Sequence, residues 1–329
     1  MKAKASERWN SRQVWLRQRL SKFSGFFPKQ IMDVFIQVPW GIKPSENLTY
    51  FNAENPTLVP FALSKSGVGQ RTLTTYRIID RSDLTPALTV WIYQDGSTIK
   101  SGLIPLAEDA RVFQFEDSLY IYYQIAVQKS DGSLDCDIYV FDPERSKTNQ
   151  LISPFSFNGK NWIPYQYQGD LFFIYSIDPL IVFKAAEWTD DELVLDLVFP
   201  KHYKTPEPFT WGDDLELFGG IRGGSQLISV RNHELLAFTH VTPKGILKFS
   251  HQAGVLLFNA KDFTFEHIFL TRLKPGLLID PFGIQIENNV VQMSYSFSIN
   301  NPHEKASVVG SSIATFELSE LLQEFNASE

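Results

Sequence analysis

Apolar and polar residues alternate along most of the chain in short runs that are separated by polar turns. Residues 108–124 show the unit most clearly: an alternating apolar run ends at the polar turn 116–118, and an aromatic-rich run follows over residues 119–123. Alternation with a period of two is typical of β-strands, and two such runs around a short polar turn predict a β-hairpin. The chain is therefore predicted to be built from hairpins.

The hairpin pattern occurs five times along the chain. The copies lie at residues 55–77, 108–124, 161–176, 222–240 and 280–297. Four corresponding apolar residues, Leu119, Leu171, Leu235 and Val290, are 52, 64 and 55 residues apart. A four-stranded propeller blade with its loops has about this length. The sequence therefore predicts an all-β fold, a five-bladed β-propeller.

The two ends of the chain predict helices outside the blades. Residues 1–30 carry eight Lys or Arg and one acid, Glu7, around an apolar stripe that includes Trp9 and Trp15. This pattern is typical of a basic amphipathic helix. A second apolar stripe, from Phe316 to Phe325, predicts a short C-terminal helix that docks on the body.

These patterns divide the chain into an N-terminal amphipathic extension, residues 1–45, and a five-bladed propeller catalytic domain, residues 46–329. The basic helix has three interpretations. It packs against the propeller or a second subunit as part of a homo-oligomer, it contacts a membrane surface, or it is an organelle-targeting segment.

Composition narrows the classes of protein and partner. With 43% hydrophobic and 14% aromatic residues, the chain can bury the core of one globular unit. The single cysteine, Cys136, fits a reducing compartment, and we expect a cytoplasmic location. No apolar run reaches the ~18 residues of a transmembrane helix. The net charge of −7 argues against nucleic acid as a partner.

The spacing of ligand-type residues predicts neither a cofactor nor a metal. The six histidines are scattered without a ligand-like spacing, and there is no glycine-rich phosphate loop at a strand–helix junction.

Polar residues recur at corresponding positions of the hairpins, and such positions meet around the channel of a propeller. Those before the first strands are Asn55, Asp109, Asn161, Arg222 and Asp280. Those that close the second strands are Arg77, Gln124, Ser176 with Asp178 just beyond, His240 and Ser298. Few of these residue types favour a dry core, so the repeats predict a polar funnel that carries an acid, several cations and a histidine.

A lone acid among basic residues suits the handling of sugars and anions. A carboxylic acid can protonate an oxygen leaving group, while Arg77, Lys160 and Arg222 could hold a phosphate. Inverting hydrolysis of a glycoside normally needs two carboxylates, one of which activates water. Transfer to phosphate needs one, because phosphate is already a nucleophile. The pattern therefore favours phosphorolysis or transfer over hydrolysis.

Several stretches also resemble a known group of enzymes. They are FNAENPTLVPF (51–61), TYR (75–77), EDARVFQFEDSLYIYY (108–123), KNWIPYQYQGDLFFIYSIDP (160–179) and AFTH (237–240). Their order and spacing resemble the five-bladed propellers of glycoside hydrolase family 130 and glycosyltransferase family 108. These are the β-mannoside phosphorylases and β-1,2-mannosyltransferases.

The resemblance implies roles for individual residues. Asp109 matches the general acid of an EDPR-type motif, although Ala110 stands where the motif has proline. The expected phosphate- or donor-binding residues are Arg77, Lys160, Asn161, Arg222 and His240. The expected substrate-binding residues are Asn55, Tyr123, Asp178 and Asp280.

We therefore expect an inverting β-mannosyl transfer enzyme, either a mannosyltransferase or a mannoside phosphorylase. Its partners would be a mannose-containing sugar and inorganic phosphate, mannose 1-phosphate or GDP-mannose. One alternative is a β-mannoside hydrolase with Glu108 or Asp178 as second carboxylate. Another is a sugar-binding propeller without turnover.

Overall fold

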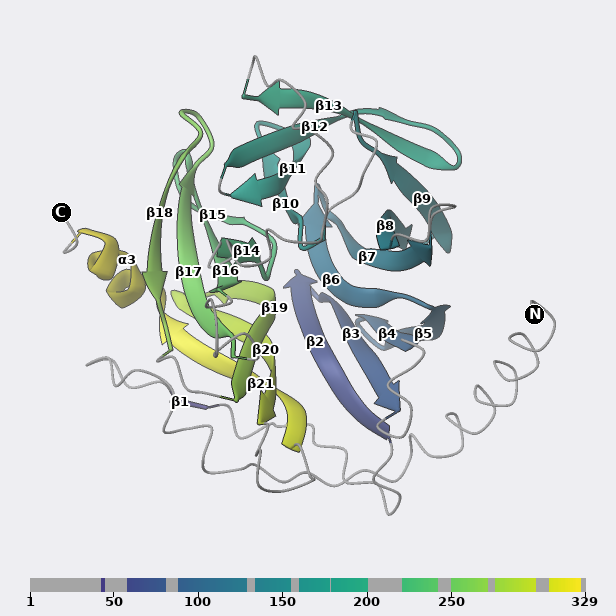
Figure 1. Ribbon diagram of the computed structural model, residues 1–329, viewed down its shortest axis with the longest axis horizontal. Coiled ribbons are helices and arrows are strands. Elements are labelled where there is room, and N and C mark those ends of the chain that lie inside the picture. Colours follow the sequence, from purple (N-terminus) through teal and green to yellow (C-terminus); the bar gives the residue numbers. More distant parts are fainter. Residues whose placement is uncertain are drawn as a thin grey trace.

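The computed structural model describes ten stretches of the chain: residues 43–44, 58–80, 88–128, 134–154, 160–177, 179–200, 221–241, 250–271, 276–299 and 308–326. Viewed down its shortest axis, the protein is a ring of β-sheets around a central axis (Figure 1). The prediction of an all-β five-bladed propeller is confirmed. The predicted basic helix lies outside the described residues.

The first blade is a four-stranded antiparallel sheet in the order β2-β3-β4-β5. Its strands are β2 (Leu58–Val68), β3 (Arg71–Asp80), β4 (Leu88–Asp95) and β5 (Thr98–Pro105). β2 and β3 form the first of the predicted hairpins, and the turn between them reverses at Gly69, where φ is +58°. Glycine adopts this left-handed conformation at no steric cost, so it suits the tight turn.

The second and third blades share one eight-stranded sheet. The strands of the second blade are β6 (Glu108–Phe115), β7 (Ser118–Gln128), β8 (Leu134–Asp142) and β9 (Lys147–Ile152). Those of the third are β10 (Ile163–Tyr167), β11 (Asp170–Ile177), β12 (Leu180–Trp188) and β13 (Glu192–Phe199). The outer strands β9 and β13 pair in parallel, with Leu151 opposite Leu193, and this pairing joins the two blades at their rims.

The fourth blade is a five-stranded sheet. Its strands are β14 (Ile221–Gly223), β15 (Ile228–Arg231), β16 (Glu234–Val241), β17 (Gln252–Asn259) and β18 (Thr264–Phe269). The order is β14-β16-β17-β18, and β15 also pairs with β16. The inner strand of this blade is therefore split into two short pieces, β14 and β15.

The fifth blade closes the ring with a strand from the other end of the chain. Its strands are β19 (Leu277–Glu287), β20 (Val290–Ile299) and β21 (Val308–Glu317), and β1 (Lys43–Pro44) pairs with the outer edge of β21. Two residues that the sequence assigns to the N-terminal extension thus form part of a blade.

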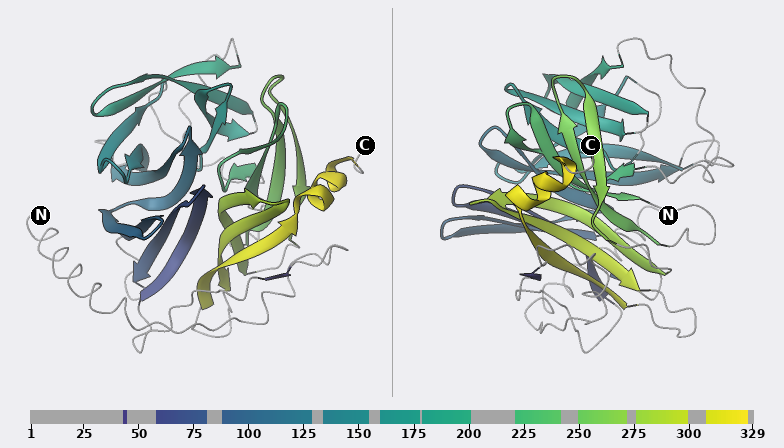
Figure 2. Two further views of the ribbon diagram at one scale, coloured as in Figure 1. Left: turned by 180° about the vertical axis from the view of Figure 1, so that it is seen from behind. Right: turned by 90° about the vertical axis from the view of Figure 1, so that its left-hand side faces the viewer.

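The predicted C-terminal helix is present as α3 (Leu318–Asn326). It lies on the outside of the ring against β18 and β21, with Leu321 and Phe325 buried (Figure 2). Within the described stretches, no helix has the length and apolar character needed to cross a membrane.

Apolar clusters fill four of the five seams between neighbouring blades. Serine hydroxyls join the described residues of the remaining seam, where the fifth blade meets the first. Ser64 Oγ donates a hydrogen bond of 2.7 Å to the Phe282 carbonyl, and Ser294 Oγ accepts one of 3.2 Å from Lys65 N. The ring is therefore closed by β1 at its rim and by hydroxyl groups near its axis.

Candidate active site

Three residues in or just before the inner strands have a left-handed backbone. φ is +49° at Asp109 in β6, +55° at Ala62 in β2 and +67° at Asn161 before β10. The pairing registers of β2 and β6 shift at these points, which marks β-bulges. Such backbone costs about 1–3 kcal/mol at a non-glycine residue, although Asp and Asn adopt it more readily than most. The bulge in β6 takes Asp109 out of the regular alternation of that strand.

Both carboxylate oxygens of Asp109 are held by side chains of neighbouring strands. Arg77 Nη1 lies 3.3 Å from Oδ1, and Gln124 Nε2 donates a hydrogen bond of 3.1 Å to Oδ2. The second guanidinium nitrogen of Arg77 contacts Glu108 Oε1 at 3.2 Å. The side chains of Asp109 and Arg77 are only 15% and 18% exposed, so this ion pair is weakly screened by solvent.

The charges around Asp109 keep it ionised. Burial on its own would raise the pKa of this carboxyl. The positive charges of Arg77, Lys160 and Arg111 outweigh burial and hold the pKa of Asp109 below its usual range. At neutral pH, Asp109 is therefore a carboxylate that can accept a proton.

Arg111 connects the inner ends of several blades. It is 1% exposed, and its Nε donates a hydrogen bond of 2.8 Å to the Gly224 carbonyl of the fourth blade. Its Nη1 donates to the Asp109 carbonyl at 3.2 Å, and its Nη2 donates to Asn161 Oδ1 at 2.8 Å. The guanidinium also lies over the Phe282 ring of the fifth blade, 5.1 Å from its centroid. One buried cation thus fixes both left-handed site residues.

Two glycines allow the blades to approach Arg111. A Cβ atom on Gly223 would lie 2.2 Å from the carbonyl oxygen of Asn161, and one on Gly224 would lie 2.8 Å from that of Phe238. No side chain fits at such distances. The backbone after Arg222 therefore comes close to the third blade only because residues 223 and 224 are glycines. The Gly223–Gly224 pair is therefore a packing requirement of the site.

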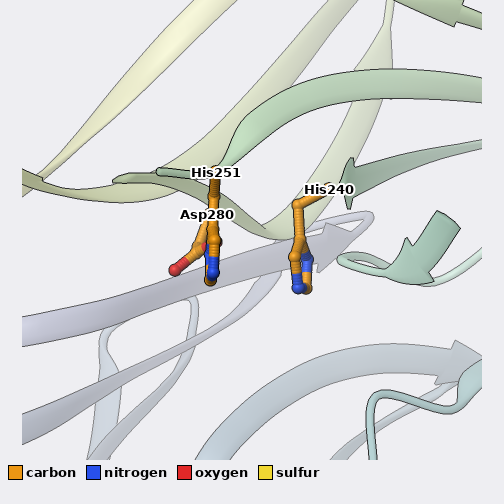
Figure 3. Close-up of side chains that lie close together, drawn as sticks. All are labelled: His240, His251 and Asp280. Carbon is orange, nitrogen blue, oxygen red and sulfur yellow. The ribbon is translucent and has the colours of Figure 1, made fainter. Parts of the chain in front are cut away.

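A second polar group lies where the fourth blade meets the fifth (Figure 3). Arg222 on β14 is the register partner of His240 on β16. The His240 ring stacks on that of His251, with centroids 5.1 Å apart, and His251 Nδ1 lies 2.5 Å from Asp280 Oδ1 on β19. Burial favours the neutral ring and lowers the pKa of His240 to about 3.

The same three side chains offer the donor atoms of a cation site. His240, His251 and Asp280 each place one such atom within 4.8 Å of the other two, a ligand set that suits transition metals. Two cations stand close by, however, since Arg111 and Arg222 both act electrostatically on His240. This positive surrounding opposes a divalent cation and favours an anion.

Seven of the ten predicted site residues lie close to one another. Contacts or charge interactions connect Arg77, Asp109, Lys160, Asn161, Arg222, His240 and Asp280. Tyr123 is placed elsewhere: it is buried in the apolar cluster between the first and second blades and stacks on Tyr139. Asn55 and Asp178 lie outside the described residues.

Two residues of the site were not among those predicted. Arg111 follows Asp109 by two positions, and its charged side chain gives no sign in the sequence of being buried. His251 precedes the third strand of its blade, whereas the predicted site residues were taken from the hairpin formed by the first two strands. The histidine spacing along the chain did not show that His240 and His251 stack.

Comparison with known proteins agrees with the propeller. No protein-family model matches the chain, and no curated protein matches it in sequence. Among solved structures, a hypothetical protein from Leishmania major superposes with a TM-score of 0.54 at 11% identity, over 84% of this chain and 90% of that one. MPT-4, a mannose phosphorylase from Leishmania mexicana in complex with phosphate ion, superposes with a TM-score of 0.51 at 11% identity, over 83% and 88%.

This chain shares its fold with a mannose phosphorylase. The resemblance that the motifs indicate is thus confirmed at the level of the fold. At 11% identity, the roles of individual residues are argued below from the site of this chain.

Proposed function

We propose that the protein is a carbohydrate-active enzyme that transfers a β-mannosyl group with inversion between a phosphate donor and a hydroxyl acceptor. The observation that carries the proposal is the ionised carboxylate of Asp109, ion-paired to Arg77 in a channel rich in cations. The mannose phosphorylase that shares the fold was solved with phosphate, which supports an anionic ligand here.

The charge of the channel favours a phosphate ligand. Arginine and lysine bind phosphate through charge-assisted hydrogen bonds, and four such cations, Arg77, Arg111, Lys160 and Arg222, surround the site. Of these, Arg111 is committed to carbonyl and amide oxygens. The charges of Arg77 and Lys160 act on Asp109, and Arg222 is the register partner of His240. These three cations are the proposed phosphate ligands.

The ionised state of Asp109 favours the transfer direction. A hydroxyl acceptor must lose a proton as it attacks the anomeric carbon, and a carboxylate at that oxygen can accept it. In phosphorolysis the same group must return the proton to the leaving oxygen, because the forward and reverse reactions share one transition state. The resting protein therefore holds Asp109 ready for synthesis.

Phosphate binding also provides the route to phosphorolysis. An anion that binds Arg77 competes with the carboxylate of Asp109 for the same guanidinium. The carboxyl then loses its main stabilising charge, and its pKa rises. We therefore propose that the bound anion adjusts Asp109 for the direction of the reaction.

A β-mannoside hydrolase is the second candidate function, because the channel contains another buried carboxylate. Glu108, one of the two candidates from the sequence, is ion-paired with Arg77. Asp280 is a second candidate, because it is a carboxylate whose negative charge acts on Asp109. An inverting hydrolase uses two such groups, one as acid and one as base.

The test is an incubation with mannose 1-phosphate or GDP-mannose and mannose acceptors, in which released phosphate or GDP is measured. Asp109→Asn should lower the rate by a factor of about 10²–10⁴, the usual contribution of a proton-transfer group. Asp117→Asn, an exposed position in the turn of the same hairpin, is the matched control and should keep the wild-type rate.

Three results would contradict the proposal. Equal rates in wild type and Asp109→Asn would remove the role of this carboxylate. Release of mannose from β-mannosides without phosphate would move the assignment to a hydrolase. Tight sugar binding with no product on long incubation would indicate a propeller that binds sugar without turnover.

A further inference from the structure

His251 is a polar residue of the channel that the proposed reaction does not yet use. It immediately precedes β17, and its Nδ1 lies 2.5 Å from Asp280 Oδ1 on β19. The two side chains are 23% and 14% exposed, so the pair is mostly shielded from water. A histidine held by a buried carboxylate is the arrangement that orients proton-transfer groups in many enzymes.

The backbone fixes both members of this pair. His251 N donates a hydrogen bond of 3.0 Å to the Leu277 carbonyl, and Ile279 N donates one of 3.3 Å to the His251 carbonyl. Ile279 is the neighbour of Asp280, so these bonds set the spacing between imidazole and carboxylate. The pair is therefore part of the framework between the fourth and fifth blades.

Asp280 determines which nitrogen of His251 is available. Burial would raise the pKa of Asp280, but the neighbouring His251, as charge and as hydrogen-bond donor, holds it below its usual range. The carboxylate is thus ionised and accepts a hydrogen bond from Nδ1–H of His251. Nε2 is left as the atom of His251 that can exchange a proton with a ligand.

His240 lies beside His251 and is uncharged, so it is not a second proton donor. Its ring extends in the same direction as that of His251 (Figure 3). It is neutral at physiological pH, and its buried Nδ1 has no hydrogen-bond partner among the described residues. Arg222 is its register partner. A polar ligand at the edge of the stacked rings would lie next to a cation as well.

We propose that His251, oriented by Asp280, is a catalytic residue that protonates the departing phosphate of a glycosyl phosphate monoester. This inference rests on the proposed transfer function and names its donor class.

In the proposed step, Asp109 acts on the acceptor hydroxyl and His251 acts on the departing phosphate. The acceptor oxygen bonds to the anomeric carbon and gives its proton to the Asp109 carboxylate. The bond between the anomeric carbon and the phosphate oxygen breaks, and phosphate leaves with the electron pair. That oxygen takes the proton from Nε2 of the His251 imidazolium, which becomes a neutral ring whose remaining proton stays on Nδ1 against Asp280. Asp109 later loses its proton to solvent, and His251 regains one.

The charge on the leaving group decides which class of donor needs an acid. A phosphate monoester is largely dianionic at neutral pH, since its second pKa is about 6. Without a proton, its phosphate would depart as a trianion. A nucleoside diphosphate spreads the departing charge over two phosphate groups and has less need of an acid. An acid at this position therefore serves a sugar phosphate such as mannose 1-phosphate.

The experiment compares two donors of the same anomeric configuration, mannose 1-phosphate and mannosyl fluoride. Fluoride leaves as a stable anion and needs little protonation. His251→Gln keeps hydrogen-bonding atoms at the site but cannot transfer a proton. His233→Gln, at a hairpin turn where the histidine bonds the Tyr167 hydroxyl, is the matched control.

We expect His251→Gln to lose a factor of about 10²–10⁴ in kcat/KM with mannose 1-phosphate and less than about tenfold with the fluoride. Asp280→Asn should show the same donor-dependent loss, because it presents the wrong partner to Nδ1. Asp109→Asn should lose activity with both donors, and His233→Gln with neither.

Equal losses with the two donors, or wild-type rates with mannose 1-phosphate, would overturn the role of His251. Melting temperatures within a few degrees of wild type would show that the variants are folded, and Asp280→Asn tests the pair independently of His251. A wild-type protein inactive with both donors would instead contradict the proposed function, on which the inference rests.

Discussion

Arg111 Nη2 donates a hydrogen bond of 2.8 Å to Asn161 Oδ1, and the two residues belong to different blades. The same guanidinium holds the carbonyl of Asp109, so two residues with strained backbone share one buried donor. Strain of this kind persists only where the surroundings over-determine it. The position of the proposed catalytic carboxylate therefore depends on packing among several blades.

Replacement of Arg111 by lysine should uncouple these residues. Lysine keeps the charge but has a single ammonium group in place of the planar fork, so at least one buried hydrogen bond is lost. Each lost bond to a charged group costs about 1.5–3 kcal/mol. We expect urea unfolding to show a loss of at least about 1.5 kcal/mol. Arg145→Lys, at an exposed residue, should change stability by less than about 0.5 kcal/mol.

Arg77→Gln should move the pH dependence of transfer. Arg77 is the strongest of the charges that lower the pKa of Asp109, so its removal raises that pKa. The ascending limb of kcat/KM against pH should then shift to higher pH. Arg71→Gln, on the same strand but paired with Glu144, is the control and should leave the limb unchanged. An unshifted limb in Arg77→Gln would contradict the ion pair as the cause.

The ion pair also predicts how stability depends on pH. The pKa of Asp109 is lower in the folded protein than in the unfolded chain, where it is about 3.9. Its carboxylate therefore contributes stability above the unfolded pKa, and that stability is lost as the pH falls through the folded pKa. The difference in unfolding free energy between wild type and Asp109→Asn should be constant near neutrality and shrink in acid. A difference independent of pH would show that the carboxylate is not stabilised in this way.

Ser64 offers a test of how the ring closes. Its hydroxyl donates to the Phe282 carbonyl and accepts a hydrogen bond of 2.8 Å from Val112 N, so it joins the first blade to the fifth and the second. Ser64→Ala leaves two buried backbone groups without this partner, and should cost about 1–3 kcal/mol. Ser101→Ala, exposed on β5, should be neutral. Chemical denaturation of both variants measures the difference.

Tyr123→Phe tests whether this residue binds the sugar or only packs between two blades. The sequence placed it in the substrate site, whereas the structure packs it against Tyr139 between two blades. Loss of a hydroxyl at that place should leave kcat/KM within about twofold of wild type and affect stability only. A large rise in KM for the sugar would return Tyr123 to the site.

The hairpins could be predicted because residues close together in the sequence specify each one. Alternation and turn residues specify each strand pair, and the repeated spacing then gives the number of blades. The closing strand β1 has two residues, and it belongs to the last blade only through its pairing with β21. Nothing in so short a segment indicates its partner.

Part of the site could be predicted because its residues recur at one position of the repeat. Asp109, Asn161, Arg222 and Asp280 occupy corresponding positions of the repeat, so periodicity alone brings them to one place. The contact of His251 with Asp280 joins residues 29 positions apart in different blades, and no repeat relates them. The burial of Arg111 depends on the bulge at Asp109 and on the close approach of Gly223 and Gly224.

The most direct test of the central claim is the initial rate of phosphate release from mannose 1-phosphate, with a mannose acceptor, measured from acid to neutral pH. With Asp109 as the base, kcat/KM should rise with pH in the acid range as this carboxyl ionises. The Asp109→Asn variant should show a rate lower by a factor of about 10²–10⁴ at neutral pH and should lack this rise. A variant that matches wild type across the range would contradict the account.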